Sequence, residues 1–163
     1  MALNYFTPDY AVSVHDKILS ISGGRKGIKD LNMIISPLAH ITNDDYYPSF
    51  EEKLTHIVFS FNKFHGFSDG NKRSSIALGA FFFIVNGLDV FVDKFIVEME
   101  NITVAVAQDI IDKPMLQRII TSVINDEDFP ENLKLDIFDA LSRVVQDDNE
   151  YEIMGPGFFT NLF

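Results

Sequence analysis

A short polar stretch, HGFSDGNKR at residues 65–73, gathers side chains that could carry out chemistry. His65 is a residue type that accepts protons near neutral pH, and Asp69 is a carboxylate of the kind that binds Mg²⁺. Lys72 and Arg73 are cations, and an Arg side chain can contact two phosphate oxygens at once. A base, a metal ligand and an anion site in so short a stretch indicate transfer of a phosphorus-centred group.

Two expected helices flank this stretch and would position it. Residues 49–64 keep apolar side chains at helical spacing, and Ser49 and Glu52 have the spacing of a capping box. Residues 74–86 are apolar almost all round, which is typical of a buried central helix. Because the first turn of a helix presents amide groups that favour an anion, the polar stretch would lie at an anion-binding helix end.

Three further residues complete the expected loop. Gly70 allows the backbone to turn sharply or to approach a ligand closely, and Asn71 could hydrogen-bond to the bend or to the anion. Phe67 is expected to point inward and to anchor the loop to the core. The alternative is a capped turn with a purely structural role, in which Asp69 forms a salt bridge with a neighbouring cation. The spacing alone does not decide between the two.

The rest of the chain has the pattern of helices joined by short loops. Thr7 is a residue type preferred at a helix N-cap, and Pro8 is one preferred in the first turn. Together they predict a helix that begins here and runs to Gly23. Residues 39–48 are expected to form a loop or a small hairpin. The other expected helices span residues 29–38, 94–111, 114–125 and 133–145.

Two regions leave alternatives or irregular structure. A strand is the alternative for residues 94–111, because β-branched side chains are frequent there. Residues 146–163 are acidic and then aromatic, and we expect them to be an irregular tail. The expected organisation is therefore one all-α domain over residues 1–145, followed by this tail.

The charge distribution limits the partners of the protein. The 163 residues carry 13 Lys and Arg against 24 Asp and Glu, a net charge of −11. Residues 1–75 hold 8 of these cations and 8 carboxylates, so the remaining 5 and 16 account for the whole excess. Nucleic acid is not an expected partner, because its phosphates would be repelled.

The composition also bears on the compartment and on metal sites. The absence of cysteine excludes disulfides and thiolate metal sites. The apolar run at residues 76–85 is shorter than the ~20 residues that cross a membrane, and the first residues lack the pattern of a signal peptide. We expect a cytoplasmic protein with no membrane partner.

The stretch HGFSDGNKR resembles the signature of the Fic/Doc (Fido) family, His-x-Phe-x-Asp/Glu-Gly/Ala-Asn-Gly/Lys-Arg. Weaker similarity to Doc-type (death-on-curing) members lies in residues 22–40 and 47–66, and the resemblance extends over roughly residues 8–125. All seven specified positions of the signature agree: His65, Phe67, Asp69, Gly70, Asn71, Lys72 and Arg73.

The resemblance implies a fold and a set of roles. The fold would be a helical bundle around the buried central helix, with a small β-hairpin flap that we place at residues 40–47 and that aligns the target. His65 would be the general base on a Ser, Thr or Tyr hydroxyl of a target protein, and Asp69 would be the Mg²⁺ ligand. The phosphates of ATP would lie in a cradle formed by Gly70, Asn71, Lys72 and Arg73.

Family members commonly transfer AMP from ATP, whereas Doc-type members transfer a phosphoryl group. Lys72 stands where the AMP-transferring pattern has Gly, and Ile76 stands where that pattern has a second Arg. Both departures favour phosphoryl transfer, with AMP transfer (AMPylation) as the alternative. A non-catalytic anion-binding module is the alternative from another class.

Many relatives carry an inhibitory helix with Ser or Thr four residues before a Glu. No Glu of this chain has Ser or Thr at that position. We therefore expect no internal inhibitor, and the resemblance to Doc implies a toxin that is restrained by a separate antitoxin protein.

Overall fold

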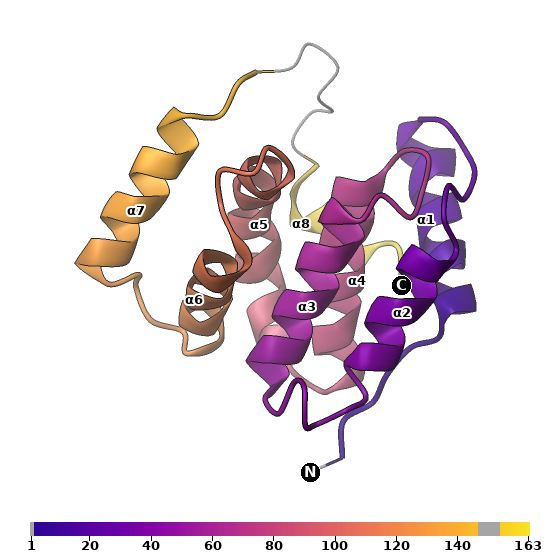
Figure 1. The fold of residues 1–163 in the computed structure, drawn as a ribbon, viewed down its shortest axis with the longest axis horizontal. Coiled ribbons are helices and arrows are strands. Elements are labelled where there is room, and N and C mark those ends of the chain that lie inside the picture. The colour runs from indigo at the N-terminus through magenta and orange to yellow at the C-terminus, as the bar shows by residue number, and fades with distance from the viewer. Residues whose placement is uncertain (1, 147–153) are drawn as a thin grey trace.

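The computed structural model describes residues 2–146 and 154–163, and in these residues the fold is helical (Figure 1). The described part holds no strand, only an isolated bridge between Ile28 and Phe67. None of its helices has the length and apolar character that crossing a membrane requires. The elements are α1 (Pro8–Ser22), α2 (Asn32–His40), α3 (Phe50–Lys63), α4 (Asn71–Val85), the short 3₁₀ helix η1 (Asp89–Phe91), α5 (Val92–Ala107), α6 (Lys113–Ile124), α7 (Glu131–Ser142) and α8 (Gly155–Thr160).

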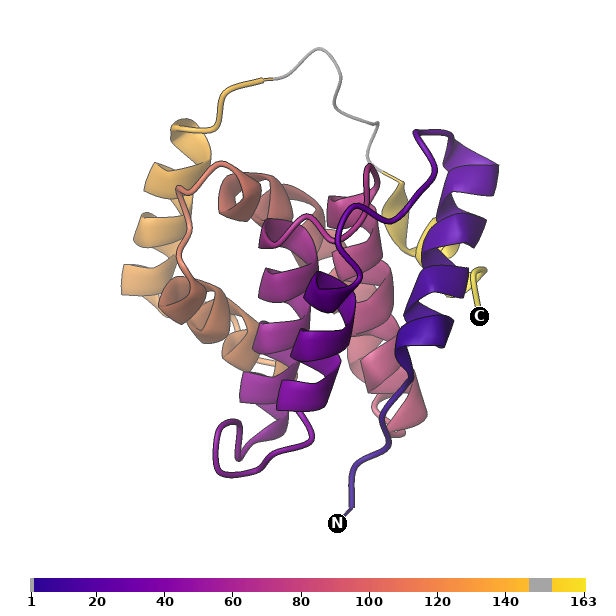
Figure 2. The same cartoon turned by 45° about the vertical axis from the view of Figure 1, so that its right-hand side comes forward.

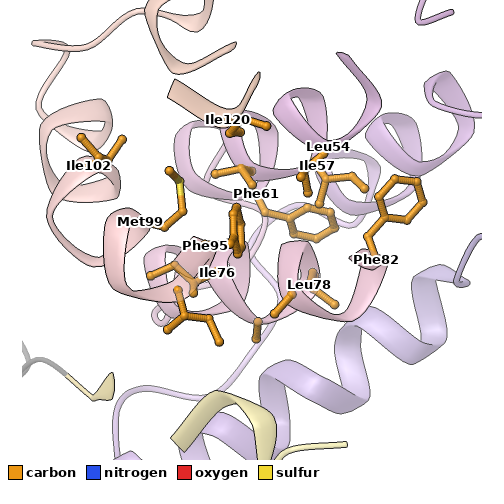
Figure 3. Packing of buried hydrophobic residues seen from close by; sticks show 14 of the residues in the cluster. Leu54, Ile57, Phe61, Ile76, Leu78, Phe82, Phe95, Met99, Ile102 and Ile120 are labelled. Carbon is orange, nitrogen blue, oxygen red and sulfur yellow. The ribbon is translucent and has the colours of Figure 1, made fainter. Parts of the chain in front are cut away.

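Helix α4 is the centre of the bundle and packs against α1, α3, α5 and α8 (Figures 1 and 2). Its side chains Leu78 and Phe82 are fully buried and lie among the core residues of α3 and α5 (Figure 3). A Cβ at Gly79 would lie 2.7 Å from the ring of Phe95, so the absence of a side chain lets α5 approach α4 closely. The prediction of a buried central helix is confirmed.

Local capping signals define several helix starts. The Thr7 side chain accepts a hydrogen bond from the amide of Tyr10 (3.1 Å) at the start of α1. The capping box of α3 is complete, because the Ser49 hydroxyl accepts from the amide of Glu52 and the Glu52 carboxylate accepts from the amide of Ser49. The strand alternative for residues 94–111 is wrong, since the buried positions of α5 repeat at helical spacing.

Helix α4 begins three residues earlier than the sequence predicts. Gly70 adopts the left-handed conformation (φ 77°) and ends the loop, so Asn71, Lys72 and Arg73 form the first turn of the helix. Three of the residues with expected chemistry therefore lie on a rigid element.

The β-hairpin flap expected at residues 40–47 is wrong, whereas the loop that was the other alternative for residues 39–48 is confirmed over residues 41–48. Residues 41–49 form turns without a strand, and Lys53 holds them by donating to the Ile41 carbonyl and the Asp44 carboxylate (both 2.7 Å). This loop precedes α3, whereas the loop of interest follows it (Figure 1). A helix of 14 residues is ~21 Å long, so the two loops lie at opposite ends of the bundle.

The end of the chain folds back on the bundle. Residues 155–160 form α8, which packs against α4 and α5, so the expectation of irregular structure is wrong for them. Phe159 is buried, and Lys17 donates to the carbonyl of Leu162 (2.9 Å). Residues 147–153 of the expected acidic tail lie outside the described residues.

Candidate active site at the start of helix α4

The loop between α3 and α4 is anchored by a buried aromatic side chain. Phe67 is 1% exposed, and its ring stacks on the imidazole of His15 in α1, with 3.7 Å between the ring centres. The amide of the Asn71 side chain closes the bend by accepting from the Phe67 amide (3.1 Å) and donating to the Phe67 carbonyl (3.0 Å). Both polar atoms of Asn71 thus hold the loop itself.

Asp69 gathers hydrogen bonds from two segments. One carboxylate oxygen accepts from the amide of Gly70 (2.7 Å), and the other accepts from the amide of Arg25 (2.9 Å). The guanidinium of Arg73 lies 3.7 Å from the carboxylate. The Asp69 side chain is 24% exposed, so it remains in reach of solvent while its orientation is fixed.

Two residues outside the signature stretch support Asp69. The Nε2–H of His15 donates to the backbone oxygen of Asp69 (2.7 Å). Its place on the buried face of α1, next to Val14 and Ile18, was the signal that could have identified it. A Cβ at Gly24 would lie only 2.7 Å from the Asp69 carboxylate, so this position requires glycine.

Arg73 joins the start of α4 to the end of α1. Its buried guanidinium donates to the carbonyl of Gly23 (2.8 Å) and to the hydroxyl of Ser22. The first of these contacts covers the carbonyl group of Gly23, which the end of α1 leaves without a backbone partner in the helix. Arg73 therefore has a structural function in addition to the positive charge that it brings to the site.

The segment that pairs with the loop is residues 23–31. Ile28 forms an antiparallel bridge with Phe67, flanked by the bonds from Lys29 N to Gly66 O (2.8 Å) and from Ser68 N to Gly27 O (3.0 Å). Figure 2 shows this segment, between α1 and α2, passing beside the loop before α4. The residues next to the site are thus these, not the expected 40–47.

A cavity of about 700 Å³ opens at the start of α4. His65, exposed and at a positive φ of 50°, lies at this cavity. The structure brings six of the seven signature residues to the cavity lining, and Phe67 is buried beneath: the lining six are His65, Asp69, Gly70, Asn71, Lys72 and Arg73.

The opposite wall comes from α5 and α8. Thr103 and Val104 of α5 line it, together with Phe159 of α8. Glu100 also faces the cavity, and its carboxylate accepts from the amide of Gly155 at the start of α8 (2.7 Å). The cavity therefore has a basic end at α4 and a partly apolar wall.

The start of α4 has the electrostatics of an anion site. The first backbone bond of the helix runs from Ser74 N to Gly70 O (2.9 Å), so the preceding amide groups face the helix end. The helix dipole and the charges of Lys72 and Arg73 add positive potential there. The combination can hold a phosphate group with an imidazole beside it.

The first half of the chain matches a known protein family. Residues 5–83 match the sequence model of the Fic/DOC family. The matched segment is just under half of the chain and covers α1 to α4, so it includes the signature loop and the segment paired with it. No curated protein and no solved structure matches the chain.

The Fic/DOC match agrees with the resemblance of the signature, and it points to a Fic-type transferase in general. It does not separate Doc-type members from the others. The wall formed by α5 and α8 lies outside the matched residues, so its contribution to the site is known only from the structure.

Proposed function

We propose that the protein transfers a phosphate-containing group from ATP to a hydroxyl side chain of a target protein. The observation that carries this proposal is the gathering of His65, Asp69, Lys72 and Arg73 around one cavity at a helix start. The volume of about 700 Å³ lies within the ~300–1,000 Å³ of small-molecule sites. The Fic/DOC match over the same residues supports it.

The chemical step follows from these positions. The hydroxyl oxygen of the target attacks phosphorus while the imidazole of His65 takes its proton. The bond from that phosphorus to the bridging oxygen breaks, and the leaving phosphate keeps the electron pair. Lys72, Arg73 and the amides of the first turn stabilise the negative charge on the phosphate oxygens.

Asp69 is the proposed ligand of Mg²⁺. No group of three His, Asp or Glu side chains in the described residues could hold a metal ion. A single carboxylate suits Mg²⁺ that arrives with a nucleotide, because this ion takes one or two carboxylates together with phosphate oxygens and water. When bound, the ion would neutralise phosphate charge.

The segment at residues 23–31 is proposed to do what the flap was expected to do. It pairs with the loop that carries His65, through the bridge between Ile28 and Phe67. A target segment laid along it would bring its hydroxyl close to the imidazole.

Phosphoryl transfer is favoured over AMP transfer. Ile76 lines the cavity one turn after Lys72, where a second Arg would have contacted another phosphate. With one fewer bidentate contact and an added Lys, the γ-phosphate is the proposed one to face His65. AMP transfer remains the alternative, and a Doc-type toxin restrained by a separate antitoxin remains part of the proposal.

Two parallel labelling experiments test the function. The protein is incubated with Mg²⁺, a cell extract and ATP labelled at either the α or the γ phosphate. Label from γ alone on a protein identifies phosphoryl transfer, and label from α identifies AMP transfer. His65→Ala should lose the labelling and still bind a non-hydrolysable ATP analogue.

The non-catalytic module is the competing function. It is favoured by the structural hydrogen bonds of two signature residues, because Asn71 bonds the loop at Phe67 and Arg73 bonds the end of α1 at Gly23. Absence of labelling with either ATP, together with binding of the analogue, would establish it.

A further inference from the structure

Residues 23–31, which we name the basic segment, carry three exposed cations beside the proposed site: Arg25, Lys26 and Lys29. Their single carboxylate neighbour in the segment, Asp30, accepts a hydrogen bond from the amide of Asn32 at the start of α2 (3.0 Å). The segment therefore has a local excess of positive charge, in a chain whose net charge is −11.

These cations form no ion pair within the described part of the chain. No ion pair joins Arg25, Lys26 or Lys29 to a carboxylate there, and the nearest polar contact is from the Arg25 guanidinium to the carbonyl of Ser68 (3.4 Å). None of the three lines the 700 Å³ cavity, although Ser68, which accepts from Arg25, does. The three exposed cations therefore lie at the rim of the proposed nucleotide site and not in its lining.

The backbone places the basic segment in a defined position relative to His65. The bonds that flank Ile28 and Phe67 make them a non-hydrogen-bonded pair, so the N–H and C=O of Ile28 point away from the loop. This outward edge can pair with an extended chain. The Ile28 side chain is 44% exposed and offers an apolar contact on the same edge.

We infer that the basic segment binds an extended acidic stretch of the target protein and so selects hydroxyl residues that have Asp or Glu close by. The inference rests on the proposed function and adds the class of target. Charges near the segment act over about one Debye length, ~8 Å at physiological ionic strength. A short acidic peptide is attracted by the cations of the basic segment alone. A long nucleic acid would also be repelled by the carboxylates of the rest of the chain.

The test measures peptide binding to the full chain without nucleotide. Three fluorescent peptides share one central serine and differ in flanking Glu, Gln or Lys, and anisotropy gives their affinities at low and physiological salt. We expect the Glu peptide to bind about tenfold more tightly than the Gln peptide at low salt. This ratio of affinities should fall as the salt concentration rises.

Matched variants show whether the basic segment causes the preference for the Glu peptide. Lys26→Glu/Lys29→Glu should remove the preference for the Glu peptide, whereas Lys94→Glu/Lys134→Glu changes the net charge equally at remote positions and should keep it. Lys26→Ala/Lys29→Ala should weaken binding of the Glu peptide without attracting the Lys peptide. Far-ultraviolet circular dichroism checks that each variant folds.

Three results of the binding experiments would overturn the inference. These are equal affinity for the Glu and Gln peptides, equal loss in the remote double variant, and tighter binding of a single-stranded oligonucleotide than of the Glu peptide. Because binding is measured without ATP, failure of the labelling experiment would leave this result intact. Conversely, His65-dependent labelling of a target that lacks nearby acidic residues would support the function and refute the selectivity.

Discussion

The Nε2–H of His15 donates to the backbone oxygen of Asp69 across a distance of 2.7 Å. This bond connects the first helix of the bundle to the loop that carries the proposed base and metal ligand. The stacking of the same imidazole on Phe67 fixes the loop from a second side. The orientation of Asp69 therefore depends on a residue far from it in the chain.

Replacing His15 tests this support. His15→Leu leaves the partly buried carbonyl of Asp69 without its donor, and we expect a loss of about 1–3 kcal/mol in the free energy of unfolding. His15→Gln keeps a donor and should lose less. Urea unfolding measures the stability, and group transfer should fall more in the Leu variant than in the Gln variant. Equal stability and transfer in both variants would contradict the role.

Gly24 and Gly23 form a matched pair for testing the close contact with Asp69. Both have positive φ, 127° and 84°, so alanine introduces backbone strain of about 1–3 kcal/mol at either position. Only the Cβ at Gly24 meets the Asp69 carboxylate, at 2.7 Å, while the Cβ at Gly23 has open space.

Gly24→Ala should therefore lower the transfer rate by about 10²-fold, as expected for a displacement of ~1 Å in a site. Gly23→Ala should lower the melting temperature and leave the rate nearly unchanged. Thermal unfolding and single-turnover labelling measure the two effects. A similar fall in rate in both variants would show that strain, not the contact, is responsible.

A buried histidine makes stability depend on pH. Burial lowers the pKa of His56 to about 3, with the charges of Lys113 and His40 adding to the effect. Lys113 donates to His56 Nδ1 at 2.8 Å, and the ring of Tyr47 stacks on the imidazole at 4.3 Å. His56 is therefore neutral in the folded protein.

Between pH 6.5 and about 3 the unfolded chain binds the proton at His56 and the folded one does not, so acidification favours unfolding. The free energy of unfolding should fall by up to ~1.4 kcal/mol for each pH unit below 6.5. His56→Gln, which keeps an acceptor for Lys113, should flatten this slope in denaturant titrations. Burial raises the pKa of Glu98 from 4.5, so this carboxyl acts in the opposite sense from pH 4.5 upward. Because Glu98 is present in both proteins, the difference in slope between the unchanged protein and His56→Gln isolates the effect of His56.

Two neighbouring phenylalanines of α8 allow the effect of lining the cavity to be distinguished from the effect of packing in general. Phe159 lines the cavity and is 1% exposed, whereas Phe158 is half-buried and does not line it. Phe159→Ala should cost about 3–5 kcal/mol of stability and weaken binding of an ATP analogue. Phe158→Ala should affect stability less and binding little. Calorimetric titration with the ATP analogue, at a low temperature where both variants are folded, measures their affinities. Equal affinities would show that Phe159 does not contribute to nucleotide binding.

Much of this protein follows from its sequence because the signals are local. The Thr7 cap, the capping box at Ser49 and the apolar run of α4 act through residues within one or two helical turns, and each is found as predicted. Six of the seven signature residues share one cavity lining for the same reason, since they are close neighbours in the chain.

Other features depend on contacts between distant segments, which no local pattern specifies. The flap was expected at residues 40–47, but the bridge from Ile28 to Phe67 shows that residues 23–31 accompany the loop. Tertiary packing alone decided that His15 supports Asp69 and that Phe159 closes the cavity. Periodicity tells which face of a helix is buried but not against which partner, and that pairing is set by the packing of the whole bundle.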